Sequence, residues 1–164
     1  MNSRNWNALA RVSLISTLLL GIAVSPAPAQ DQEERRDEKS AKIEGAWFVQ
    51  VTIVNCSNGA TIRTFPAINT FSPGQIMGGS TAASSPAQLA PGIGTWESTG
   101  GQRYSGVTIG FLFDATGVWS GTQKLTHAIR LRGDEILFNS TVQFFDTNNV
   151  QLSAGCATGV GHRI

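Results

Sequence analysis

The sequence predicts an all-β fold, built as one antiparallel up-and-down β-barrel of about eight strands. After Glu44, apolar and polar residues alternate repeatedly, and Gly, Pro, Asn and Asp interrupt the alternation at short intervals. This pattern is typical of half-buried strands joined by hairpins. No segment keeps a helical period over a dozen residues, which argues against helical and α/β architectures.

The first half of the domain contains four expected strands. The apolar residues of the first strand share one face: Trp47, Val49, Val51 and Ile53. A second run covers residues 64–71, a short third run surrounds Ile76, and residues 93–99 resume the pattern. Between the third and fourth runs, residues 80–92 are small, polar and rich in proline, which predicts an exposed loop.

The second half shows the cleanest alternation. Residues 103–113 place their large apolar side chains on one face: Val107, Ile109, Phe111 and Phe113. Residues 114–117 supply turn chemistry, and the strand over residues 118–132 has its own apolar face: Trp119, Leu125, Ile129 and Leu131. After a turn at Gly133 and Asp134, strands over residues 135–146 and 150–164 complete the expected set.

The two cysteines help to choose between a closed barrel and a two-sheet sandwich. Cys56 follows the first expected strand and Cys156 opens the last one. In an even-numbered closed meander these two strands pair antiparallel, so a Cys56–Cys156 disulfide would join the barrel seam. Closing a loop of about 100 residues would stabilise the fold by about 4 to 5 kcal/mol. A sandwich with an inter-sheet disulfide, or two free thiols, are the alternatives.

The beginning of the chain predicts export. Arg4 and Arg11 precede an apolar run over residues 12–24, and Ala27-Pro28-Ala29 has the small-x-small form of a signal-peptidase site. We therefore expect a signal peptide at residues 1–29, a charged flexible spacer at 30–43 and the β-barrel domain at 44–164. The expected localisation is secreted or periplasmic, with no membrane span after cleavage.

Charge makes nucleic acid an improbable partner. Arg4 and Arg11 belong to the expected signal peptide, so its removal reduces the 12 basic residues to 10. Against 11 acidic residues this gives the expected mature protein a net charge of −1. Such a chain attracts neither nucleic acid nor an anionic membrane surface. The sequence leaves the oligomeric state open.

One short motif resembles a known family. Gly45-Ala46-Trp47 has the G-x-W form that opens lipocalins and other calycin barrels. The resemblance implies that Arg163 is the basic residue that packs over that tryptophan. The domain as a whole resembles a lipocalin-like or an allene oxide cyclase-like barrel. The C-terminal helix of true lipocalins is absent from the pattern. The resemblance implies a barrel that holds one small molecule.

Polar residues on inward faces are the candidates for ligand binding. His127 and Gln123 share the parity of Leu125 and Ile129, so both are expected to point inward. Two further candidates complete this set of four: Arg103 at the barrel mouth and Asn69 on the second strand. His162 shares the parity of Val160 and Cys156 in the last strand. His127 and Arg103 are also the candidate catalytic pair, as a general base and a carboxylate anchor. No metal-site, phosphate-loop or cofactor motif occurs in the sequence.

Three functional hypotheses follow from these residues. The first is a non-enzymatic binder of a small apolar or amphipathic ligand. The second is a cofactor-free isomerase or cyclase of the allene oxide cyclase type. The third is an exported interaction or inhibitor protein that works through its surface or through the loop at residues 80–92. Barrels of this kind carry many unrelated functions, so the site has to decide between them.

Overall fold

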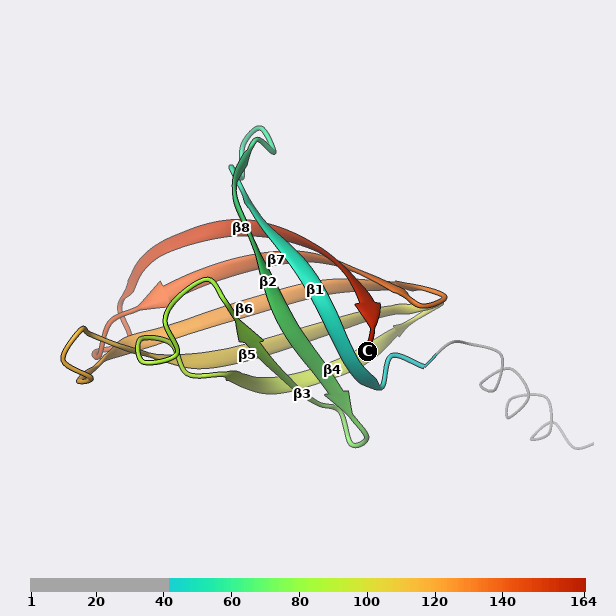
Figure 1. Ribbon diagram of the computed structural model, residues 1–164, viewed down its shortest axis with the longest axis horizontal. Helices are drawn as coiled ribbons and strands as arrows, with labels where there is room; N and C mark the ends of the chain where they lie inside the picture. The colour runs from blue at the N-terminus through green and yellow to red at the C-terminus, as the bar shows by residue number, and fades with distance from the viewer. Residues whose placement is uncertain (1–41) are drawn as a thin grey trace, which may run out of the picture.

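The protein is a closed antiparallel barrel of eight strands in sequential order, as a computed structural model shows (Figure 1). The structure describes residues 42–164, so the predicted signal peptide and residues 30–41 of the predicted spacer lie outside the described residues. The expected fold class is confirmed. The strands are β1 (Gly45–Val54), β2 (Thr61–Ser72), β3 (Ile76–Thr81), β4 (Gly92–Gly100), β5 (Arg103–Phe113), β6 (Trp119–Arg132), β7 (Glu135–Phe145) and β8 (Gln151–Arg163).

The seam of the barrel lies between β1 and β8. These strands pair antiparallel, from Trp47 opposite Arg163 to Val54 opposite Cys156. Cys56 lies two residues beyond Val54 and forms a disulfide with Cys156, with the two Cα atoms 5.3 Å apart. The predicted disulfide and its place at the seam are therefore both confirmed.

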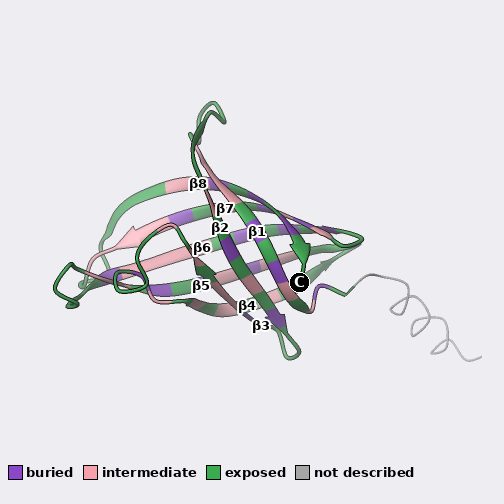
Figure 2. Cartoon of the chain, viewed as in Figure 1, coloured by how far each residue is buried: buried purple, intermediate pink, exposed green. Residues whose placement is uncertain are grey.

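One end of the barrel is filled by a hydrophobic core. Trp47 is fully buried there, and its indole Nε1 donates a 2.9 Å hydrogen bond to the carbonyl oxygen of Ile43. Ile43 is itself only 1% exposed, so this last residue of the predicted spacer belongs to the core. Figure 2 shows buried segments gathered where β1 and β2 cross the other strands. The core comprises Ile43, Trp47, Val49, Ala67, Phe71, Met77, Ile129, Leu131, Ile136 and Phe138.

The face of β5 that carries Ile109 and Phe111 points out of the barrel, although its large apolar side chains suggest that it points inward. Ile109 and Phe111 are exposed on the outside of the barrel, whereas Gly106, Thr108 and Gly110 are buried. The reason is lack of space. A Cβ on Gly106 would meet the sulfur of Met77, and one on Gly110 would meet the backbone and side chain of the β3–β4 loop. The interior is already occupied at these two positions, so glycines face inward there, whereas Tyr104 packs against the core and Leu112 lines the cavity described below.

A bulge at the start of β6 corrects a second expectation. Leu112 is paired with Gly121, but its neighbour Phe113 is paired with Trp119, so Ser120 is an extra residue. One extra residue reverses the side-chain alternation. Trp119 is therefore on the outer face and 45% exposed, rather than on the inner face with Leu125 and Ile129.

Within residues 42–164, no helix is both long and apolar enough to cross a membrane.

Candidate functional site

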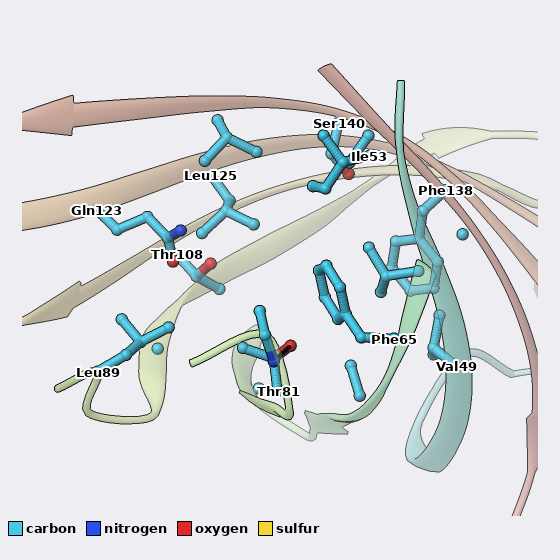
Figure 3. A pocket seen from close by; sticks show the side chains of 18 of the residues that line it. Val49, Ile53, Phe65, Thr81, Leu89, Thr108, Gln123, Leu125, Phe138 and Ser140 are labelled. Atoms are coloured by element: carbon cyan, nitrogen blue, oxygen red, sulfur yellow. Dashed lines mark hydrogen bonds between the residues drawn. The ribbon is translucent and has the colours of Figure 1, made fainter. Parts of the chain in front are cut away.

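The half of the barrel opposite the Trp47 core contains a cavity of about 490 Å³. Binding sites for small molecules commonly have this volume. Figure 3 shows side chains from several strands pointing into one shared space, with the ring of Phe65 standing within it. Aliphatic and aromatic side chains form most of the wall, among them Val49, Val51, Ile53, Phe65, Leu125, Phe138, Val142 and Phe144.

The cavity opens at the end of the barrel where the β1–β2 hairpin and the β3–β4 loop meet. Ile62 and Arg63, at the start of β2, line the cavity and are exposed, as is Pro91 at the end of the loop. Leu89 of the same loop is only 9% exposed and forms a β-bridge with Leu112. The expected exposed loop is thus exposed over most of its length but contributes a buried residue to the cavity wall.

Polar groups form the smaller part of the cavity wall. Amide side chains contribute Asn69 from β2 and Gln123 from β6, while β5 and β7 contribute the hydroxyl groups of Thr108 and Ser140. Further hydroxyl groups come from Ser80, Thr81, Ser84 and Thr158. Arg63 is the single charged side chain lining the cavity among residues 42–164, apart from the titratable His127. Such a wall suits an apolar molecule that carries one or two polar atoms.

His127 is the central polar residue of the site. It is 7% exposed on β6, and its Nδ1 lies 2.8 Å from the hydroxyl oxygen of Ser140. Its Nε2 lies 3.5 Å from the hydroxyl oxygen of Thr108, at the long limit of a hydrogen bond. The ring of Phe138 packs edge-on against the imidazole, with the ring centroids 5.8 Å apart. These contacts hold the ring between the core and the cavity.

Burial lowers the pKa of His127 from its usual 6.5 to about 4. Removing the imidazolium from water costs free energy, and no carboxylate lies beside it to compensate among the described residues. The imidazole is therefore neutral at pH 7. It can donate one hydrogen bond and accept another, but it is a weak base.

The structure brings together three of the four predicted ligand-binding residues. Gln123, His127 and Asn69 all line the cavity, whereas Arg103 does not. Arg103 lies exposed at the start of β5, on the outward face together with Ile109, because the inner face of β5 is the glycine face. The expected approach of Arg103 to His127 is therefore wrong. His162 is exposed as well, and pairs with the outward-facing Phe48.

Sequence reasoning missed several residues of the cavity. Arg63 has the inward parity of Phe65, and the two residues are neighbours on the same face of β2. The expected strand began at residue 64 and so left Arg63 out. Starting it at Thr61, where β2 begins in the structure, would have included Arg63. Thr108 was missed because its strand was read on the wrong face.

No protein-family model matches this chain, and neither does any of the curated proteins compared with it.

Metal chemistry has no visible anchor in the described part of the chain. Residues 42–164 contain no group of three or more His, Cys, Asp or Glu side chains placed to hold an ion. The cavity instead offers an apolar surface, a neutral imidazole and a few hydroxyl and amide groups. That combination can hold and orient a largely apolar molecule.

Proposed function

We propose that this protein binds a small apolar or amphipathic molecule inside the barrel. The observation that carries the proposal is the cavity of about 490 Å³, whose wall is mainly aliphatic and aromatic and whose mouth reaches solvent beside Arg63. An apolar ligand moving into this space would be removed from water, which is the main source of free energy for such binding.

The arrangement of the two barrel ends supports the same function. At one end Trp47 and its neighbours fill the interior, while at the other the interior is left open. Well-packed domains leave few voids, because an unfilled space removes favourable contacts. A cavity of this size beside a filled core is therefore a feature to be explained, and a ligand explains it.

The placement of Trp47 and Arg163 favours a relationship to lipocalins and other calycin barrels. The guanidinium of Arg163 lies over the indole, as the G-x-W motif implies for that family. The predicted signal peptide and the Cys56–Cys156 disulfide favour a secreted or periplasmic protein, because disulfides persist in oxidising compartments. A carrier or scavenger of a poorly soluble molecule fits both features.

A cofactor-free isomerase or cyclase is the second candidate, since His127 borders the cavity. A general base works best when its pKa is near the working pH, and the pKa of His127 is about 4. Arg103, the residue expected to anchor a substrate carboxylate beside His127, also lies outside the cavity. These two facts favour the binding function over the enzymatic one.

Filling the cavity tests the binding function directly. Gly155 lines the cavity, and a Cβ added there meets no atom within 4 Å. Gly155→Leu should therefore fold and occupy part of the space. With Nile red as a neutral apolar probe, we expect saturable fluorescence enhancement by the wild-type protein and a clear loss of binding by Gly155→Leu.

The matched control is Ala154→Leu, which places the same side chain on the residue of β8 that precedes Gly155. Ala154 is exposed and does not line the cavity. That variant should bind Nile red like the wild type. Native mass spectrometry of protein purified from its own host should in addition detect a co-purified small molecule. Equal binding of Nile red by both variants would contradict the proposal.

A further inference from the structure

The mouth of the cavity carries one cationic side chain whose position is defined by the fold. Arg63 pairs with Ile53 across β1 and β2, and both residues line the cavity. Residues directly opposite in an antiparallel pair share a face of the sheet. Arg63 therefore begins on the inner face of β2 and reaches the rim, where it is exposed to solvent.

Two contacts hold the guanidinium in place. Its Nη2 donates a 2.9 Å hydrogen bond to the carbonyl oxygen of Ala83 in the β3–β4 loop. Its central carbon lies 5.0 Å from the ring centroid of Phe65, in a cation–π contact. A guanidinium has five N–H donors, and the bond to Ala83 uses one of them. Donors therefore remain for a ligand, and the group is already oriented before a ligand arrives.

Among residues 42–164, no carboxylate forms a salt bridge with Arg63. Within residues 42–164 the single salt bridge joins Arg163 to Asp134, at the other end of the barrel. No Asp or Glu of the described chain lines the cavity. A ligand that enters the cavity therefore meets a positive charge at the mouth and an apolar wall beyond it.

We propose that the barrel selects an amphiphile with a carboxylate head and an apolar chain, and that Arg63 binds the carboxylate at the mouth. This inference rests on the proposed binding function and specifies its ligand class. A planar guanidinium matches the two oxygens of a carboxylate. The chain then extends past Phe65 toward the apolar wall, while the charged head stays at the rim, where water reaches it. A cationic amphiphile would be repelled at the same point.

Dodecanoate and dodecan-1-ol test this inference as a pair, because they share a chain and differ in the charge of the head. Isothermal titration calorimetry below the micellar concentration, at pH 7 and low salt, should give a lower Kd for dodecanoate. In Arg63→Gln we expect the Kd for dodecanoate to rise by about five- to tenfold, since the contact is charge-assisted but partly exposed to water. The Kd for dodecan-1-ol should stay the same.

Arg103→Gln is the matched control, since Arg103 is an exposed cation that does not line the cavity. It should leave both Kd values unchanged, whereas added salt should weaken only the binding of dodecanoate by the wild type. Equal Kd values for the two probes, or equal effects of Arg63→Gln on both, would overturn the role of Arg63 and leave the binding function standing. If neither probe binds but Nile red does, the proposed ligand class is wrong. If none of the three binds, the binding function fails as well.

Discussion

The guanidinium carbon of Arg163 lies 4.4 Å from the ring centroid of Trp47, so the last strand closes the barrel over the first. The same side chain donates 2.7 Å hydrogen bonds to the carbonyl oxygens of Glu44 and Lys42. Its ion pair with Asp134 is longer, at 3.7 Å, and Asp134 is largely exposed, so that pair adds little stability. Arg163 thus joins β8 to the chain segment before β1 and covers Trp47.

Replacing Arg163 by methionine should lower the free energy of unfolding by about 2 kcal/mol, because one cation–π contact and two charge-assisted hydrogen bonds are lost while the bulk is kept. Urea denaturation measures this. Arg132→Met, at an exposed position at the end of β6, should change stability by less than about 0.5 kcal/mol. Nile red binding should survive Arg163→Met, because Arg163 does not line the cavity. A loss no larger than that of the control would mean that the contact is not stabilising.

The disulfide should act on the unfolded chain more than on the native barrel. Cys56 and Cys156 are 100 residues apart in sequence, so the bond closes most of the described domain into one loop. The double variant Cys56→Ser, Cys156→Ser should lose about 4 to 5 kcal/mol of unfolding free energy. Adding dithiothreitol to the wild type should produce a similar loss, while the double variant should not respond to it. A wild type indifferent to reduction would contradict the prediction.

Stability should fall in mild acid because of His127. Burial lowers its pKa to about 4 in the folded state, against about 6.5 in an unfolded chain. Between these values the unfolded state binds a proton that the folded state does not. The contribution is therefore present in full above pH 6.5 and is lost as the pH falls toward 4, by about 3 kcal/mol at most.

The variant His127→Gln separates this effect from the titration of carboxylates. Glutamine retains hydrogen-bonding capacity toward Ser140 but does not titrate. Urea unfolding at pH 7 and at pH 4.5 should show a larger loss for the wild type than for the variant. Parallel losses in the two proteins would show that His127 is not the group responsible.

The closed barrel was predictable because its evidence lies in local alternation and in two cysteines. Alternation located all eight strands, and the positions of Cys56 and Cys156 favoured the seam between β1 and β8. Gln123 and His127 were placed on the correct face because the apolar residues of β6 beyond its bulge mark the core side. Each of these inferences depends on residues close together in one strand, or on one covalent link.

The parts that sequence reasoning missed depend on contacts between distant segments. Gly106 faces inward because Met77 of β3 occupies the space beside it, and no pattern within β5 carries that information. Trp119 faces outward because of an extra residue, Ser120, which is visible only from the pairing of β5 with β6. The expected position of Arg103 in the cavity was wrong for the first of these reasons, since its direction depended on the face assigned to β5.

The β3–β4 loop should control how fast a ligand leaves. Ala90 donates a 3.0 Å backbone hydrogen bond to the carbonyl of Phe111, and the buried Leu89 packs into the cavity wall beside Gly110. Leu89→Ala removes the buried part of this attachment but leaves the barrel core intact. If this attachment holds the loop over the ligand, a loss of about 1 to 2 kcal/mol of its packing free energy corresponds to about tenfold faster dissociation.

Stopped-flow measurement of Nile red release tests this prediction, with Ala87→Ser as a control at an exposed position of the same loop. The control should release the probe at the wild-type rate. Because changes at one binding site usually alter the dissociation rate more than the association rate, the change should appear mainly in dissociation. If Leu89→Ala leaves dissociation unchanged, the loop does not cover the ligand. The ligand would then leave through the mouth beside Arg63 without any movement of the loop.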